Sequence, residues 1–179
     1  MNTFLRLCTL AASLTIFFFA ASSTSNTASA QATATASASA TIVTPISISK
    51  TADMHFGNVA VSASAQGTVV LAPAGTRTAT GGVTLPATAG SPAAAAFTVS
   101  GEANYTYAIT LPSADIQLVN PSSVYMDAGS FTSFPSATGT LSAAGNQTLT
   151  VGATLEVAAG QAAGTYTTTA NFDVTVNYN

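Results

Sequence analysis

The stretch Leu149-Thr150-Val151-Gly152-Ala153-Thr154-Leu155-Glu156-Val157 decides the fold class. Its odd-numbered residues are apolar, and its even-numbered residues are Thr, Gly and Glu, which is the two-residue period of a strand with one buried face. The same alternation continues outward in both directions. Tyr105, Tyr107, Ile109 and Leu111 share one face of a run, and a longer run with one parity covers Tyr166, Thr168, Ala170, Phe172, Val174, Val176 and Tyr178.

Shorter β-like runs and regular turn signals complete this pattern. The runs are Thr68–Leu71, Val83–Leu85, Phe97–Val99 and Ile116–Val119, and Gly, Pro or Asn pairs separate them at short intervals. Many short strands with frequent turns indicate an all-β protein, and we predict a single immunoglobulin-like antiparallel β-sandwich with no helix after residue 31. The residues that we expect in its core are Phe56, Phe97, Ile109, Leu111, Leu155, Phe172, Val174 and Val176.

The first thirty residues have the layout of a secretory signal peptide. One arginine, Arg6, precedes the apolar run Leu7–Ala21, and Ala28-Ser29-Ala30 provides an Ala-x-Ala cleavage site. Cleavage there would remove Cys8, the sole cysteine, and leave Gln31 as the new N-terminus. We therefore predict three parts: a signal peptide (residues 1–30), an Ala/Thr/Ser-rich extension (31–40) and the β-sandwich domain (41–179). An exported protein would reside in the periplasm, at the cell surface or outside the cell.

The composition argues against several classes of function. The chain has three Lys or Arg and six Asp or Glu residues, and only Lys50 and Arg77 are basic after residue 30. Neutralising the phosphates of a nucleic acid needs a basic surface, so we expect no nucleic-acid partner. Acid–base and metal chemistry need titratable groups, so we expect no enzyme and no cofactor. No later segment has the roughly 20 apolar residues of a membrane span.

Residues 31–50 extend the alternation beyond the length that one sandwich can pair. Ala or Ile occupies nearly all even positions, and Thr or Ser most odd ones. Pro45 lacks an N–H donor and belongs at an edge or bulge. We divide the segment into a first strand of the domain, Ile42–Ser49, and an extension, Gln31–Ala40. The extension is either a linker or ordinary first strand, or it pairs with another molecule. The residues assigned to assembly are Ala32, Ala34, Ala36, Ala38, Ala40, Ile42 and Tyr178.

Several segments resemble a bacterial exported family, domain of unknown function 4402. They are Thr41–Gly57, Gly75–Val83, Phe97–Gly101, Tyr105–Pro112, and the ending from Ala163–Tyr166 through Val174–Asn179. The family name assigns no activity, but the resemblance extends to immunoglobulin-like subunits of fimbriae and to spore-coat-U-like surface proteins. It implies a neighbour's N-terminal strand completing the sandwich, and a penultimate aromatic such as Tyr178. The implied partners are copies of the chain and a periplasmic chaperone and usher.

Residues that carry chemistry are few and scattered. Asp53 and His55 share a strand face, but no third metal ligand is visible, so we interpret His55 as an ordinary strand residue. Gly-x-Ser-x-Gly is absent from the sequence. Arg77 is expected to pair with an acid or to cap backbone carbonyls.

Two classes of function remain. The first is a pilin-like or coat-like structural subunit that assembles by β-strand addition. The alternative is a self-contained binding module for carbohydrate or a surface ligand, with Tyr105, Tyr107 and Tyr125 as candidate stacking surfaces. For Tyr105 and Tyr107 the shared parity with Ile109 favours an inward position instead.

Overall fold

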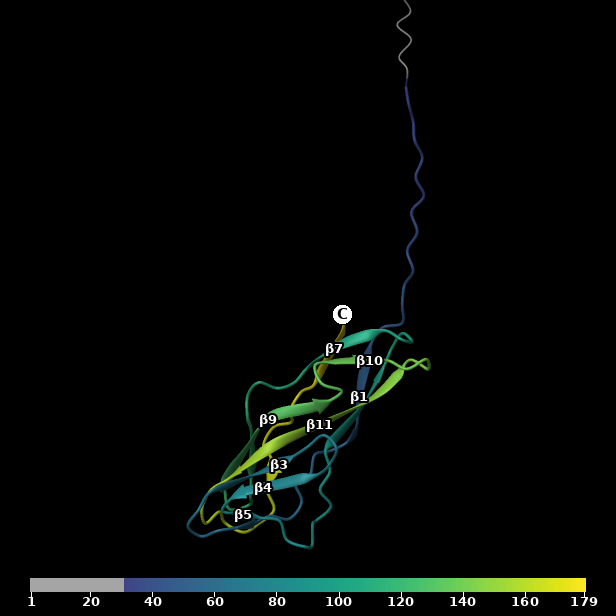
Figure 1. The fold of residues 1–179 in the computed structure, drawn as a ribbon. Coiled ribbons are helices and arrows are strands. Elements are labelled where there is room, and N and C mark those ends of the chain that lie inside the picture. Colours follow the sequence, from purple (N-terminus) through teal and green to yellow (C-terminus); the bar gives the residue numbers. More distant parts are fainter. Residues whose placement is uncertain (1–30) are drawn as a thin grey trace, which may run out of the picture. The chain divides into compact units, whose positions relative to one another are not determined.

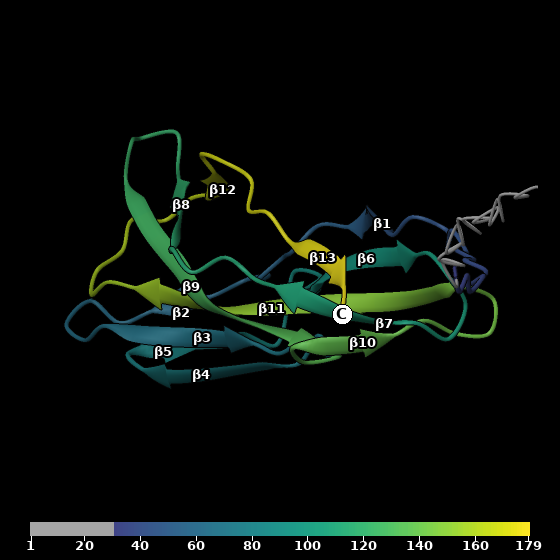
Figure 2. The ribbon, with the colours of Figure 1, turned by 90° about the horizontal axis from the view of Figure 1, so that it is seen from above.

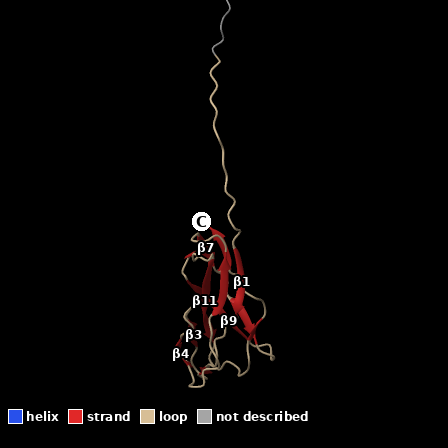
Figure 3. Cartoon of the chain, turned by 90° about the vertical axis from the view of Figure 1, so that its right-hand side faces the viewer, coloured by secondary structure: helices blue, strands red, loops and turns tan. Residues whose placement is uncertain are grey.

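The computed structural model of the chain describes residues 31–179. The predicted signal peptide, residues 1–30, lies outside the described residues. Residues 41–179 form one compact unit, distinct from the residues that precede Thr41. Strands, turns and loops make up the described part, which contains no helix (Figure 3). Within residues 31–179 there is accordingly no apolar helix of membrane-crossing length.

Short strands dominate, and two longer ones form the middle of the domain (Figure 1). The strands found between residues 31 and 179 are β1 (Ser47–Ala52), β2 (Ala60–Val61), β3 (Gly67–Leu71), β4 (Arg77–Gly81), β5 (Val83–Thr84), β6 (Ala95–Ser100), β7 (Thr106–Thr110), β8 (Ile116–Val119), β9 (Tyr125–Phe134), β10 (Thr138–Thr140), β11 (Asn146–Val157), β12 (Thr167–Thr168) and β13 (Thr175–Tyr178).

All strand pairs are antiparallel, and they form one large and two small sheets in the described residues. The large sheet has the order β1-β6-β11-β9-β8-β12, with β3 pairing to β11 and β4 to β3. A three-stranded sheet has the order β10-β7-β13, and β2 pairs with β5. Apolar side chains from the large and three-stranded sheets pack together, as in a sandwich. The predicted all-β antiparallel sandwich is thereby confirmed.

Strand β11 organises the large sheet because it changes partners along its length. Its first half pairs with β6 and its second half with β3, while β9 pairs along the opposite edge. The change occurs at Gly152, where an added Cβ would overlap the carbonyl oxygen of Leu71 and the backbone of Ala72 and Pro73. Only glycine allows the β3 strand end to approach β11 this closely.

The interior consists of two apolar clusters, one for each half of β11. One cluster contains Phe56, Val69 and Leu155, and the other contains Phe97 and Leu149. Met54 and Phe131 pack against both clusters and join them. The burial pattern of β6 alternates strictly along the strand, as a two-residue period requires.

The predicted core is correct in part. Four of the eight predicted residues are buried: Phe56, Phe97, Leu155 and Val176. The others pack against the second cluster but are only half-buried, namely Ile109, Leu111, Phe172 and Val174. Phe172 and Val174 lie in a segment without strand pairing, and Leu111 lies just beyond the end of β7. Loose coverage at such positions leaves part of each side chain in solvent.

The prediction of one long C-terminal strand, 166–178, is wrong. β12 pairs with β8 in the large sheet, whereas β13 pairs with β7 in the three-stranded sheet. The chain must therefore cross from one sheet to the other, and the connecting segment between Thr168 and Thr175 forms no strand (Figure 2). A uniform parity cannot reveal such a crossing, because parity does not indicate which strand a segment pairs with.

Two further expectations near the strand ends are also wrong. The first strand begins at Ser47 rather than Ile42, and it runs to Ala52. Tyr107 is fully buried as expected, but Tyr105 is 45% exposed because it precedes β7 and lies in a turn. The parity argument holds within a paired strand and fails one residue outside it.

Candidate functional site

A backbone clamp on Thr44 is the main polar feature at the N-terminal boundary of the domain. The Thr44 amide donates a hydrogen bond of 2.9 Å to Oε2 of Glu102. The Thr44 carbonyl oxygen accepts a hydrogen bond of 2.7 Å from the Tyr178 hydroxyl. These two side chains bind both polar groups of one residue and occupy the positions that a neighbouring strand would otherwise take.

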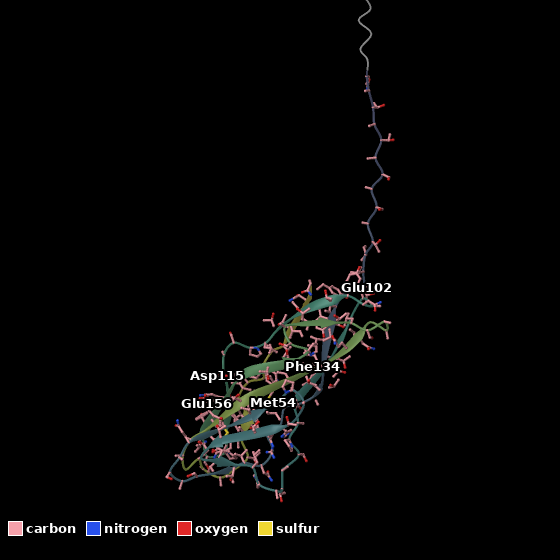
Figure 4. All side chains as sticks on the ribbon, in the orientation of Figure 1. Met54, Glu102, Asp115, Phe134 and Glu156 are labelled. Atoms are coloured by element: carbon pink, nitrogen blue, oxygen red, sulfur yellow. The ribbon has the colours of Figure 1, made fainter. Side chains whose placement is uncertain are left out.

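Tyr178 is held at this place by three contacts. Its hydroxyl accepts a hydrogen bond of 2.6 Å from the Glu102 amide, so one oxygen joins the Glu102 and Thr44 backbones. The ring packs edge-on against Tyr105, with centroids 5.7 Å apart. Gly101 provides the room, since a Cβ there would overlap the Tyr178 hydroxyl. Figure 4 shows Glu102 at the end of the domain where Figure 1 marks the C-terminus.

The clamp changes the electrostatics of Glu102. The hydrogen bond from the Thr44 amide favours the ionised carboxylate and lowers the pKa of Glu102 below its ordinary value. Burial shifts another group in the opposite direction, since desolvation raises the pKa of Tyr107. The Tyr107 hydroxyl donates to Oε1 of Gln147 at 2.9 Å, and this buried contact is structural.

The predicted assembly residues of the extension are all exposed. Residues 31–42 form no strand, and every side chain from Gln31 to Ile42 is open to solvent. Ile42 is 96% exposed, the highest value among the large apolar side chains of the described residues. Ile46 and Ile48 have the same parity, yet they pack against their own domain's second apolar cluster. The alternating residues therefore fall into two groups on either side of Thr44. Those up to Ile42 are exposed, and Ile46 and Ile48 pack on the domain.

A large groove with mixed apolar and polar walls lies beside β1. Its volume is about 1100 Å³. Strands β1, β6, β8, β9 and β11 line it, together with the segments 53–61 and 161–174. Apolar side chains from both core clusters reach it, among them Ile48, Met54, Phe97, Leu118, Phe172 and Val174. The walls also carry polar and titratable side chains, among them Lys50, Asp53, His55 and Asp173.

Unpaired strand edges accompany this groove. β1 is the terminal strand of the large sheet and pairs with β6 alone. Within residues 31–179 no backbone hydrogen bond joins β1 to any other segment. β13 is likewise terminal in its sheet, where it pairs only with β7, and it lies near β1. Native proteins normally cover such edges, since they expose backbone donors and acceptors.

Four residues with titratable side chains other than tyrosine line the groove: Lys50, Asp53, His55 and Asp173. Lys50 and Asp53 form an exposed ion pair with each other. His55 is exposed and joins Ala93 through a backbone bridge, in agreement with its interpretation as a strand residue. No group of three or more His, Cys, Asp or Glu residues converges within residues 31–179.

Arg77 caps backbone carbonyls, one of the two roles predicted for it. One guanidinium nitrogen donates to the carbonyl oxygens of Phe56 at 2.6 Å and Asn58 at 2.8 Å. This contact ties β4 to the loop that follows Met54, a loop that also lines the groove. Arg77 therefore stabilises one wall of the groove.

Exposed aromatic side chains are the candidates for a ligand-stacking surface. Tyr125 is 51% exposed and Phe134 is 72% exposed. Tyr125 lies near Gln161, whose side-chain amide donates to its backbone carbonyl, while Tyr105 contacts Tyr178. Tyr105 and Tyr125 thus have separate neighbours, and Tyr107 is fully buried.

Sequence reasoning identified Tyr178 but missed its partners. No motif in the sequence singles out these partners: Glu102 is one of six acids, and Thr44 breaks the alternation of Ala and Ile at even positions. The available signal was that break itself, since a residue that interrupts a strand period next to a proline is a poor strand residue. The partner on Thr44 is separated by 58 residues and required the structure.

Comparison with known protein families matches most of the domain. The model of a family described as domain of unknown function DUF4402 matches residues 46–178. No curated protein and no solved structure gave a significant match. The family match covers the whole sandwich from β1 to β13 and leaves out the extension.

Proposed function

The chain belongs to the DUF4402 family, and we propose that it is a non-enzymatic, exported structural subunit whose copies join by β-strand addition. The subunit is pilin-like or coat-like and functions at the cell surface. The signal-peptide pattern of residues 1–30 supports export. The near absence of titratable side chains supports a structural role rather than catalysis.

The observation that carries this proposal is the anchored but unpartnered N-terminal segment. Residues 31–42 alternate as a strand does, yet they pair with nothing and leave Ile42 almost fully exposed. The clamp on Thr44 holds the base of that segment on the domain. A segment with strand character, one fixed end and no partner in its own domain is suited to pairing with another molecule.

Partners follow from this mechanism. Copies of the same chain are the main partners, and a periplasmic chaperone and usher would protect the free edges before assembly. Exposed edges invite uncontrolled aggregation, which gives such a chaperone a physical purpose. The similarity to fimbrial and spore-coat-U-like subunits belongs to the same proposal.

Removal of residues 32–40 tests the function. The mature chain, starting at Gln31, is expected to self-associate in light scattering, whereas the deleted chain is expected to remain a folded monomer. A matched chain in which Gly and Ser replace residues 32–40 keeps the length but lowers the strand propensity, and it should also stay monomeric. If the Gly/Ser chain still assembles, residues 32–40 act only as a linker. If the deleted chain unfolds, these residues are a strand of the chain's own sandwich.

A second candidate function is a self-contained carbohydrate-binding module. The exposed rings of Tyr105 and Tyr125 favour it, because aromatic rings stack on sugars. Their different neighbours count against a shared site. A strict monomer that binds immobilised polysaccharide, and loses binding in Tyr125→Ala, would favour this candidate over assembly.

A further inference from the structure

We propose that Asn104 is an acceptor for N-linked glycosylation and takes an oligosaccharide from a lipid-linked donor during export. This inference rests on the export that belongs to the proposed function, and it adds a modification site. Asn104, Tyr105 and Thr106 form the acceptor pattern Asn-x-Thr, in which the middle residue is not proline. The pattern occurs once more, at Asn146-Gln147-Thr148, and this second copy serves as an internal comparison.

Asn104 lies in an exposed turn just before β7. The Tyr105 amide donates a hydrogen bond of 3.3 Å to the carbonyl oxygen of Glu102, which closes a four-residue turn. Asn104 is the third residue of this turn, has a φ of 63° and is exposed, and Thr106 is exposed as well. Figure 4 labels Glu102, the first residue of the turn. The acceptor amide and the hydroxyl of the pattern are therefore both open to an enzyme.

The second pattern lies in a paired strand. Asn146 begins β11 and pairs with Ser100 of β6. Its Oδ1 accepts a hydrogen bond of 3.2 Å from the Ser142 hydroxyl. Gln147 is also bound, since its Oε1 accepts a hydrogen bond of 2.9 Å from the Thr140 amide. A transferase would have to break these contacts, so the structure favours the first pattern over the second as the acceptor.

An acidic residue stands two positions before Asn104. Glu102 is one of six acids in 179 residues, whereas Ala144 has the corresponding position before Asn146. A carboxylate next to the acceptor offers a charge-assisted contact to a basic group of a transferase. In the folded domain this carboxylate accepts a hydrogen bond from the Thr44 amide, so it reaches a transferase only while the clamp is open.

The reaction is the transfer of a glycosyl group. Nδ2 of Asn104 forms a bond to C1 of the first sugar, and the bond between C1 and a diphosphate oxygen of the polyprenyl-linked donor breaks. The side-chain amide loses one proton and polyprenyl diphosphate leaves, so the step needs no oxidant or reductant. The product carries a bulky, hydrophilic sugar chain beside the exposed ring of Tyr105. This modification suits an exported chain that has few charges to keep it soluble.

Production in cells whose envelope contains an oligosaccharyltransferase and its polyprenyl-diphosphate-linked oligosaccharide tests the site. The full chain is made in cells with an active transferase and in matched cells with an inactive one, and the purified proteins are compared by intact mass and peptide mapping. We expect a single added glycan, on Asn104, in the active cells alone. Asn104→Asp should abolish it, since aspartate tolerates the same φ but has no amide. Asn146→Asp is the matched control and should leave the glycan unchanged.

Variants of the flanking residues test whether the enzyme reads the pattern. Thr106→Val removes the hydroxyl with nearly the same shape and should abolish the glycan, whereas Thr106→Ser should retain it. Glu102→Gln should lose most of the modified form, although glutamine keeps an acceptor for the Thr44 amide. A purely structural role of the turn would not distinguish serine from valine at position 106.

The outcomes separate this inference from the proposed function. If the chain is exported with its N-terminus at Gln31 but stays unmodified, while a known acceptor protein in the same cells is glycosylated, the site is wrong and the subunit function stands. A glycan on Asn146 but not on Asn104 would also overturn the site. Glu102→Gln modified as fully as the parent would exclude a role of the carboxylate. A chain that keeps residues 1–30 and stays inside the cell would overturn both the export and the modification.

Discussion

The Tyr178 hydroxyl donates a hydrogen bond of 2.7 Å to the carbonyl oxygen of Thr44, a residue 134 positions earlier in the chain. The same oxygen accepts from the Glu102 amide, and the Glu102 carboxylate accepts from the Thr44 amide. The last strand therefore fixes the point at which the N-terminal segment joins the domain. This relation gives the penultimate tyrosine a definite structural role, which the sequence alone could only suggest.

Tyr178→Phe should release the clamp while it keeps the ring. The Glu102 amide and the Thr44 carbonyl would lose their partner, so we expect the free energy of unfolding to fall by about 1 kcal/mol. Amide hydrogen exchange at Thr44 and Glu102 should become faster. The control is Tyr105→Phe, a change in the ring that packs against Tyr178, which should leave both amides unaffected. Unchanged exchange in Tyr178→Phe would contradict the clamp.

The clamp should weaken as the pH falls. Glu102 has a lowered pKa in the folded protein, so its contribution to stability is present above the unfolded-state pKa and is lost as the pH falls through the folded value. The protection of the Thr44 amide, measured relative to the intrinsic exchange rate at each pH, should fall in that acidic range. Glu102→Gln keeps a carbonyl acceptor without the charge, and it should remove this pH dependence. A Gln variant with the parent's pH profile would exclude Glu102 as its cause.

The loss of unfolding free energy on replacement by alanine should follow the burial of three phenylalanines. Phe97 is 9% exposed, so Phe97→Ala should cost about 3–5 kcal/mol of unfolding free energy. Phe172 is half-buried against Phe131, at a centroid distance of 5.1 Å, and its replacement should cost about 1–2 kcal/mol. Phe134, 72% exposed, should change stability by less than about 0.5 kcal/mol. Urea unfolding measures the order, and a Phe172 cost equal to that of Phe97 would contradict the loose C-terminal segment.

Gly152→Ala should destabilise the large sheet. The new methyl group would overlap the backbone of β3 and of the residues that follow it, so we expect a loss of about 3 kcal/mol. Gly75→Ala is the comparison, because Gly75 has a positive φ and open space around its Cβ position. Its cost should be the backbone strain alone, about 1 kcal/mol. Thermal unfolding of the two variants gives the difference, and equal shifts would argue against crowding at Gly152.

The local pattern predicted much of the fold because strand period and burial are linked. Ile116–Val119 was predicted residue by residue as a strand, and the alternation at Leu149–Val157 correctly placed five apolar residues inside. Arg77 was expected to pair with an acid or to cap backbone carbonyls, because a cation in a nearly uncharged chain needs a partner, and it caps two carbonyls. These are properties of neighbouring residues or of composition, and they need no knowledge of the topology.

The sequence by itself determined that the chain is all-β, that its strands have one apolar face, and that residues 31–42 continue the two-residue alternation. Only the tertiary structure decided where strands end, because an end depends on a partner's presence and not on parity. It divided the run 166–178 between two sheets, it began β1 at Ser47 rather than Ile42, and it placed Glu102 and Tyr178 on Thr44. The groove beside β1 likewise depends on the tertiary structure, because strands of the large sheet and the segments 53–61 and 161–174 line it together, and no single stretch of sequence contains all of its walls.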